Sequence, residues 1–96
     1  MFVVSLTYTN GIEQVNQHLE EHRRYLDEHY AKGHFIASGR KEPRTGGVIL
    51  AQGMTRAELE EMITFDPFYR TQAASYEITE FVPSKTSEQL NFLQEA

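Results

Sequence analysis

The histidines are the residues of this 96-residue chain with the most obvious chemistry, and all four lie between residues 18 and 34. An imidazole with a pKa near about 6.5 can both accept and donate a proton at neutral pH. On a helical wheel His22 lies about 20° from Val15, at the edge of an apolar stripe, so we expect it to be half-buried. Such a histidine is either a core imidazole satisfied by one acceptor or a general acid/base with a partner that fixes its tautomer.

A metal site is a second use for these histidines, because His18 and His22 have the four-residue spacing of zinc-binding pairs on helices. Zinc needs at least a third protein ligand, and His29 lies about 10 Å further along the helix axis than His22. The chain has no cysteine to supply a thiolate and no glycine-rich loop that would cradle a nucleotide phosphate. We therefore expect no metal and no cofactor, and solvated histidines are the simpler interpretation of the pair.

Asp66 is the other residue whose position asks for a chemical explanation. In TFDPFYRTQ, residues 64–72, it follows an amphipathic segment and precedes Pro67. Proline disfavours helical geometry for any residue before it, so ending a helix here does not require a carboxylate. A negative charge at a helix C-terminus is in fact mildly unfavourable. Asp66 therefore either caps the turn that follows, as an Asx turn, or meets a cationic partner.

The elements that must position these side chains alternate between strand and helix periodicity. β-branched and aromatic residues predict strands over residues 2–8, 34–40, 46–53 and 74–82. Helical spacing predicts a first helix over 11–32 and a second over 55–63, in which Thr55 and Glu58 form a capping box.

The first helix carries an apolar stripe that should face the sheet. Its members fall within a sector of roughly 60° on the helical wheel: Ile12, Val15, Leu19, Leu26 and Tyr30. We expect Asn10 to be its N-cap and Gly33 to mark its C-terminal stop.

The order of elements, βαββαβ, predicts an α+β fold of the ferredoxin-like type: a four-stranded antiparallel sheet with two helices on one face. The helices cover only that face, and the other exposes an alternating set of strand residues that is partly apolar. Small domains with such an uncovered face tend to dimerise through it, so we expect a homodimer. The tail, residues 84–96, has a weak helical pattern around Leu90 and Leu93 and either docks on a partner or frays.

In this fold the end of the second helix approaches the flank of the first. Asp66 lies at that end, which makes His22 its candidate partner. A carboxylate is the group best suited to orient a catalytic imidazole.

These residues carry a resemblance to a known family. The strand–helix opening, His22, KGHFIASGR after the first helix and FDPFYR after the second resemble the YciI-like (YCII-related) family of the dimeric α+β barrel superfamily. The resemblance covers residues 1–83, which we take as one domain, with 84–96 as a tail. It implies that His22 and Asp66 form the family's proposed catalytic dyad. Relatives include a dehydrochlorinase-like enzyme that acts on chlorinated hydroxyquinols, and the superfamily holds muconolactone isomerases and cofactor-independent monooxygenases.

Composition limits the partners of this domain. A formal charge of −5 argues against general nucleic-acid binding, which needs a basic surface. The longest apolar runs are far shorter than the roughly 20 residues of a membrane span. The N-terminal residues MFVVSLTYTNG lack the basic region and cleavage site of a signal peptide, so a cytoplasmic location is expected.

Together with the candidate acid–base pair, the resemblance implies proton transfer or elimination, of lyase or isomerase type, on a small aromatic or anionic substrate without a cofactor. Ser38 and Arg40 would bind the substrate, and Phe68 and Tyr69 would line an apolar wall. The basic loop RKEPRTGG, shorter than in many relatives, either holds an anionic substrate or solvates a hairpin. The alternative is a non-catalytic dimeric module that binds a ligand or a protein and in which His22 and Asp66 are a structural pair. A catalytic pair must open onto a pocket, and a structural pair need not.

Overall fold

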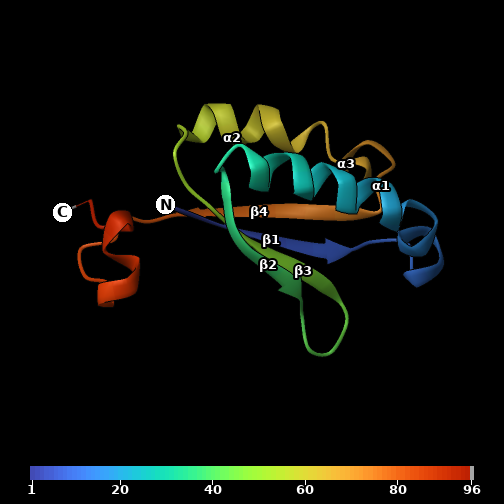
Figure 1. Cartoon of the computed structure of the whole chain (residues 1–96). Coiled ribbons are helices and arrows are strands. Elements are labelled where there is room, and N and C mark those ends of the chain that lie inside the picture. Colours follow the sequence, from blue (N-terminus) through green and yellow to red (C-terminus); the bar gives the residue numbers. More distant parts are fainter. Residues whose placement is uncertain (96) are drawn as a thin grey trace.

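A computed structural model describes residues 1–95 and has the ferredoxin-like order of elements (Figure 1). The elements are β1 (Phe2–Tyr8), α1 (Ile12–Ala31), β2 (Phe35–Arg40), β3 (Gly46–Ala51), α2 (Arg56–Ile63), α3 (Pro67–Arg70), β4 (Ala74–Glu80) and a 3-10 helix, η1 (Glu88–Leu93). The four strands begin within one residue of their predicted starts. β3 and β4 each end two residues earlier than expected, and α3 is an additional helical turn where a turn alone was expected.

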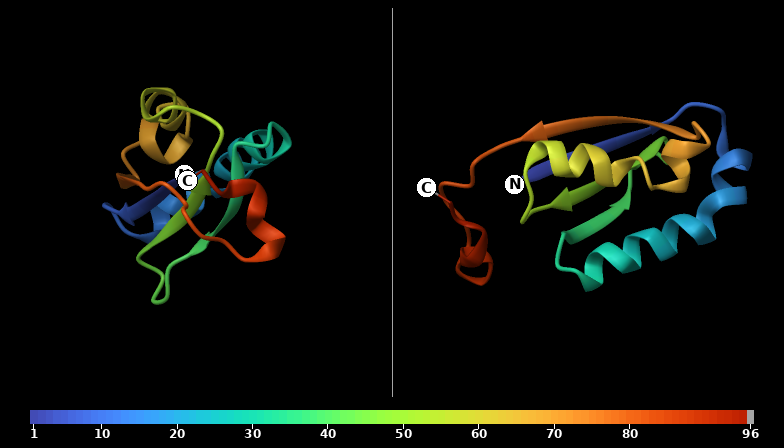
Figure 2. Two further views of the ribbon diagram at one scale, coloured as in Figure 1. Left: turned by 90° about the vertical axis from the view of Figure 1, so that its left-hand side faces the viewer. Right: turned by 90° about the horizontal axis from the view of Figure 1, so that it is seen from above.

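The four strands form one antiparallel sheet in the order β2-β3-β1-β4. The helices cover one face of this sheet, and Figures 1 and 2 show the two layers from three directions. The predicted α+β, ferredoxin-like arrangement is therefore confirmed.

The core lies between the sheet and the helices. Phe2, Val4 and Leu6 of β1 point to the helices and are at most 2% exposed. The alternate residues of the same strand, including Val3 and Ser5, lie on the open face and are half-buried. Val4 is paired with Ile49 on one side and Ile78 on the other, which carries the apolar layer across the three adjacent strands.

The buried face of α1 is rotated away from the predicted apolar stripe. Ile12 and Tyr30, which the stripe placed in the core, are 38% and 37% exposed. Val15, at the edge of the stripe, is buried as predicted, and Tyr25, His22 and His29 are buried beside it. The reason is that α1 packs against α3 as well as against the sheet, so its contact face includes polar residues that bond to the second half of the chain. His22 consequently lies well inside the contact face and is 9% exposed, deeper than the predicted half-buried edge position.

Three of the four helix ends agree with the sequence prediction, namely both ends of α2 and the C-terminal end of α1. Thr55 and Glu58 form the predicted capping box, and Gly33 follows α1 with a φ of 78°, the left-handed conformation that ends many helices. The N-cap of α1 is Gly11 and not Asn10. Asn10 does not cap because its side-chain amide donates to the backbone oxygen of Gln72, which ties the β1–α1 turn to the segment before β4.

The tail after β4 folds back on the start of the chain. The N-terminal ammonium group lies 3.1 Å from the Glu95 carboxylate, and Leu93 is 9% exposed. Figure 1 shows η1 beyond the end of the sheet at which β1 begins, away from α1, α2 and α3. Leu90 and Phe92 are exposed on this helix.

Candidate active site

His22 and Asp66 meet between α1 and the start of α3. The imidazole Nδ1 lies 2.8 Å from the Asp66 Oδ1, and the two side chains are 11% and 1% exposed. Residues 44 positions apart in the sequence are brought together because α1 packs on α3. An acceptor-only carboxylate at Nδ1 selects the tautomer in which Nδ1 carries the proton and Nε2 carries the lone pair.

Asp66 also caps α3, so the two interpretations of its role are compatible. Its Oδ1 accepts a hydrogen bond of 3.0 Å from the Phe68 backbone N–H, and Pro67 occupies the first helical position. The same oxygen accepts from His22. Ending α2 therefore falls to Pro67, whereas the Asp66 carboxylate serves the next helix and the imidazole together.

Tyr76 completes the environment of the Asp66 carboxylate from β4. Its hydroxyl donates to the Asp66 Oδ2 at 2.6 Å, so both carboxylate oxygens accept hydrogen bonds although the side chain is almost fully buried. Burial, followed by the nearby Asp66 charge, raises the pKa of Tyr76 well above the ordinary tyrosine value. Tyr76 therefore keeps its proton throughout the physiological range, and its hydrogen bond holds the carboxylate against rotation.

Aromatic rings fix the plane of the His22 imidazole. The ring stacks on Phe68 with centroids 4.0 Å apart and planes within 10°. All fully buried side-chain nitrogens and oxygens of the described residues have hydrogen-bond partners, and Nε2 of His22 has none. It follows that Nε2 reaches solvent while Nδ1 is held by Asp66.

His22 lines a cavity of about 310 Å³ between α1, the sheet and the β2–β3 hairpin. Its lining includes an apolar set (Leu6, Leu19, Leu26, Val48, Ile49 and Phe68) and a polar set (Tyr8, His22, Arg23, Ser38, Arg40 and Arg44), with Gly39 and Gly47 between them. Leu19 and Leu26 belong to the apolar stripe of α1. Because the helix is rotated, they face this cavity and are only half-buried.

The structure places three of the four predicted substrate-binding residues at the cavity. Ser38, Arg40 and Phe68 line the cavity beside His22. Tyr69 does not: it is 46% exposed and packs edge-on against Tyr76, with ring centroids 5.7 Å apart. The Ser38 hydroxyl is 2.7 Å from the Tyr30 hydroxyl, which explains why Tyr30 turns away from the core.

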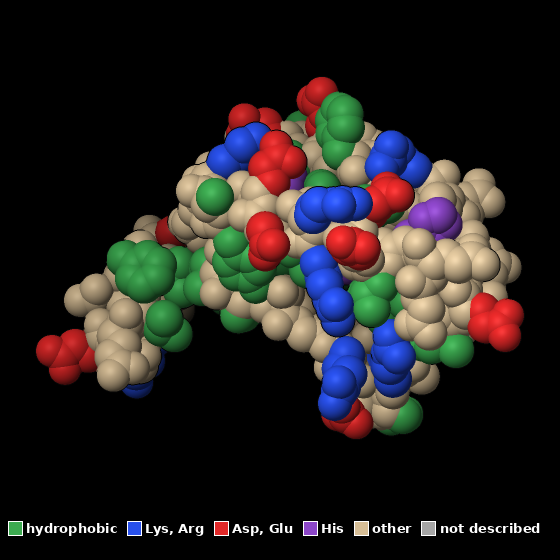
Figure 3. Space-filling view, turned by 45° about the vertical axis from the view of Figure 1, so that its right-hand side comes forward, with side chains coloured by type: hydrophobic (Ala, Val, Ile, Leu, Met, Phe, Trp, Pro, Cys, Tyr) green, Lys and Arg blue, Asp and Glu red, His purple; other side chains and the backbone are tan. Residues whose placement is uncertain are grey.

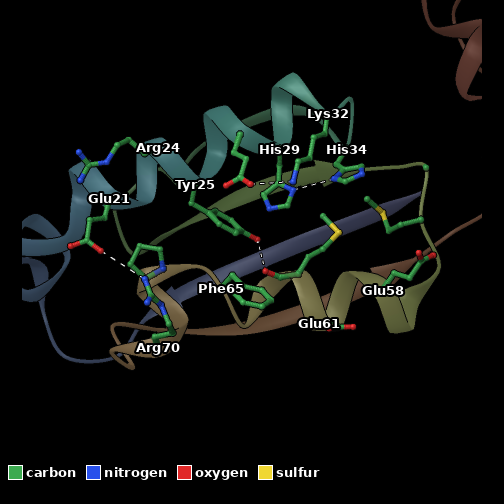
Figure 4. A pocket seen from close by; sticks show the side chains of 15 residues that line it. Glu21, Arg24, Tyr25, His29, Lys32, His34, Glu58, Glu61, Phe65 and Arg70 are labelled. Atoms are coloured by element: carbon green, nitrogen blue, oxygen red, sulfur yellow. Dashed lines mark hydrogen bonds and ion pairs between the residues drawn. The ribbon is translucent and has the colours of Figure 1, made fainter.

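A larger hollow, about 890 Å³, lies between α1 and α2 and is separate from the His22 cavity (Figure 4). Neither His22 nor Asp66 lines it. Tyr25 crosses its floor and donates a hydrogen bond of 3.0 Å to the Met62 carbonyl. Burial raises the pKa of Tyr25, which therefore stays neutral. Two ion pairs lie on its rim, Lys32 with Glu28 and Arg70 with Glu21, so size alone does not make this hollow the site of proton chemistry.

The other histidines lie outside the His22 cavity. His29 and His34 line the larger hollow, with their Nδ1 atoms 3.1 Å apart (Figure 4). Burial, and secondarily the neighbouring His34, lowers the pKa of His29. His18 is half-exposed one turn before His22. Within residues 1–95 no group of three or more histidine, aspartate or glutamate side chains is arranged to hold a metal ion.

Sequence reasoning missed two residues of this site. Tyr76 was detectable in principle, because the alternation of β4 places it on the same face as Ile78, towards the helices. Arg23 gave no signal of its own, since a charged residue next to a histidine on a helix is usually solvated. Its position at the cavity follows only from the rotation of α1.

With the fold and this geometry established, the chain can be compared with known proteins. The sequence pattern of the YCII-related domain matches residues 1–82. The chain belongs to the YCII-related domain family. No curated protein matches the sequence.

Among solved structures, this YCII-related domain is similar to 5-chloro-2-hydroxyhydroquinone dehydrochlorinase from Burkholderia phenoliruptrix AC1100, in complex with 2,5-dihydroxybenzoquinone. The match covers 85% of this chain and 93% of that chain, with a TM-score of 0.74 and 14% sequence identity. At this identity the similarity concerns the fold. None of the helices within residues 1–95 is both long and apolar enough to cross a bilayer.

Proposed function

We propose that this YCII-related domain is a cofactor-independent enzyme that moves a proton on a small substrate, with His22 as the general base and acid and Asp66 as its orienting partner. One observation carries the proposal. The Nδ1 of His22 is held by a buried carboxylate, while the opposite nitrogen, Nε2, has no hydrogen-bond partner within residues 1–95 and the imidazole lines a small cavity. A general base needs this combination of a fixed tautomer and an accessible lone pair.

The reaction that suits this site begins with Nε2 taking a proton from a carbon next to a carbonyl, or from a phenol. The electron pair left behind forms a new π bond. In an isomerisation the imidazolium returns the proton to another carbon of the substrate. In an elimination the electron pair expels a halide and the imidazolium releases its proton to solvent, so that HX leaves.

The proposed substrate is a small aromatic or anionic molecule. Phe68 and the apolar wall of the cavity would contact its ring, Ser38 would donate a hydrogen bond, and Arg40 would neutralise charge. Tyr69 was also expected to contact the substrate. It packs instead on Tyr76, the residue whose hydroxyl donates to Asp66, and would support that side chain. The dehydrochlorinase with the same fold, whose complex contains a dihydroxybenzoquinone, makes a quinol-like ring a reasonable first substrate class.

General acid–base catalysis by one histidine accounts for a rate enhancement of about 10²- to 10⁴-fold, so positioning of the substrate in the cavity must contribute the remainder. The stacked Phe68 and the three hydrogen bonds to Asp66 leave the imidazole little freedom, which favours such positioning.

The alternative is a dimeric ligand- or protein-binding module in which His22 and Asp66 are only structural. Solvent access separates the two proposals, because a structural pair gains nothing from an imidazole nitrogen that faces a cavity. The solvent exposure left to Nε2, on an imidazole that lines a cavity, favours the enzyme.

We further propose that the protein is a cytoplasmic homodimer formed through the open face of the sheet. Val3 and Leu50, which are paired across β1 and β3, form a short apolar row on that face. A second copy would cover this row and leave the His22 cavity, on the helix side, free for substrate.

The test is a screen of hydroxy- and keto-aromatic acids and chlorinated hydroxyquinols, followed by NMR in D2O for C–H exchange and by an ion-selective electrode for halide release. The wild type should turn over at least one of these compounds. His22→Gln should reduce the rate by about 10²-fold or more. His18→Gln is the matched control: it removes a histidine of the same helix that does not line the cavity, and it should leave the rate unchanged. Turnover that His22→Gln does not reduce would contradict the proposal.

A further inference from the structure

The charge of the His22 cavity is unlike that of the protein as a whole. Three arginines line it, Arg23, Arg40 and Arg44, and its lining contains no aspartate or glutamate. The chain as a whole carries a formal charge of −5. An anion-binding cavity in an acidic protein requires such a local concentration of guanidinium groups.

The three arginines differ in how they are bound. Arg40 forms an exposed ion pair with Glu42, with Nε 2.9 Å from the carboxylate. Arg44 contacts only a neutral group, donating from Nη2 to the Asn16 Oδ1 at 3.3 Å. Within residues 1–95, Arg23 has neither an ion pair nor a side-chain hydrogen bond. Arg23 and Arg44 therefore retain guanidinium donors that no carboxylate of the chain occupies.

The larger hollow provides the contrast. On its rim Arg70 faces Glu21, with 3.8 Å between Nη2 and Oε2, and Lys32 faces Glu28 at 3.1 Å (Figure 4). Every other arginine within residues 1–95 forms an ion pair with a glutamate, and the two that do not, Arg23 and Arg44, both line the cavity that contains His22.

Arg23 and Arg44 come from different elements on two sides of the cavity. Arg23 follows His22 on α1, and Arg44 lies in the β2–β3 hairpin, whose bond to Asn16 ties it to α1. Figure 3 shows lysine and arginine side chains in a band from the helices down to this hairpin at the bottom of the view. A planar carboxylate placed between two guanidinium groups can accept hydrogen bonds from both.

We propose that Arg23 and Arg44 bind the carboxylate of a single-ring carboxylic acid. This inference rests on the proposed function for the identity of the reacting end, which lies at His22. The ring contacts Leu19, Leu26 and Phe68, and the volume of about 310 Å³ accommodates a single substituted ring. Arg40, which is paired with Glu42, contributes less to binding of the carboxylate than Arg23 and Arg44 do. The substrate class is therefore an aromatic or cyclic acid with its acidic proton on the side of the ring away from the carboxylate.

The experiment is a binding titration of the full chain by two-dimensional NMR with two probes, 4-hydroxybenzoate and its neutral analogue 4-hydroxybenzamide. The wild type should bind the acid about 10-fold or more tightly than the amide, because charge-assisted hydrogen bonds are lost with the carboxylate. Arg23→Gln and Arg44→Gln should each lower the affinity for the acid by about 10-fold and leave the affinity for the amide unchanged. Inorganic phosphate should compete weakly, as it has charge but no ring.

Arg24→Gln is the matched control. Arg24 is the next residue of α1, but it lines the larger hollow and not the His22 cavity, so its loss should not change the affinity for either probe. His22→Gln should retain acid binding, which separates failure of this inference from failure of the proposed chemistry. Equal affinity for acid and amide, no binding of either probe, or an equal effect of Arg23→Gln and Arg24→Gln would each overturn the proposal.

Discussion

Tyr76→Phe is the substitution that most sharply tests how the Asp66 carboxylate is held. It removes one hydroxyl and keeps the ring, so the edge-on packing with Tyr69 and the strand position are retained. The lost hydrogen bond, 2.6 Å to Oδ2, leaves a carboxylate oxygen unsatisfied on a side chain that is 1% exposed.

A hydrogen bond to a charged group contributes about 1.5–3 kcal/mol, and a buried acceptor left without a partner forfeits a similar amount. We therefore expect Tyr76→Phe to lower the free energy of unfolding by about 2 kcal/mol, out of about 5–15 kcal/mol for a domain. For a domain of this size that corresponds to a fall in Tm of about 10 °C.

Urea and thermal unfolding followed by circular dichroism measure this change at pH 7. Tyr69→Phe is the control: Tyr69 is 46% exposed, and within residues 1–95 its hydroxyl makes no hydrogen bond, so it should change stability by less than about 0.5 kcal/mol. The difference between wild type and Tyr76→Phe should also shrink above about pH 10. The folded-state pKa of Tyr76 is raised, so the unfolded chain loses this proton first and the stability it contributes is lost as the pH rises. Equal destabilisation by the two substitutions would refute the assigned role of the Tyr76 hydroxyl.

Two further predictions concern the other faces of the molecule. Burial lowers the pKa of His29, so on acidification the unfolded chain binds this proton first and the free energy of unfolding falls below about pH 6.5. His29→Gln should make this fall shallower in urea titrations between about pH 7 and 5. An unchanged dependence of the free energy of unfolding on pH would contradict the prediction. Leu50→Asp, in the apolar row of the open sheet face, should convert the proposed dimer to a monomer in sedimentation equilibrium without unfolding it, whereas a wild-type monomer would refute the dimer.

Most of the fold could be predicted because its signals are local. Alternation gave the strands, and Thr55 with Glu58 and the left-handed Gly33 marked helix ends, since caps depend on neighbouring residues only. The misplaced N-cap shows the limit. Asn10 has the right chemistry for a cap, but its side chain is used by a contact with Gln72, 62 residues away, that no local pattern contains.

The site was predictable in part, through the spacing of a helical histidine and an Asp-Pro turn. The rest depended on the rotation of α1, which turns Leu19 and Leu26 towards the cavity and Tyr25 towards α2. That rotation is set by bonds to Met62 and Asp66 in another part of the chain. A helical wheel records only the apolar side chains of one helix, so the sector that it assigned to the core overlaps the fully buried face only at Val15, and it gave Arg23 no role.

The most direct test of the catalytic proposal is the tautomer of His22, read from long-range ¹H–¹⁵N NMR couplings of the imidazole at about pH 9, where imidazoles are neutral. The expected result is a proton on Nδ1, bonded to Asp66, and a bare Nε2 at the cavity. In Asp66→Ala the ring should become a mixture of tautomers, whereas in His18→Gln it should be unchanged. A wild-type His22 with its proton on Nε2 would contradict the proposal, because the nitrogen that faces the substrate would then have no lone pair to act as a base.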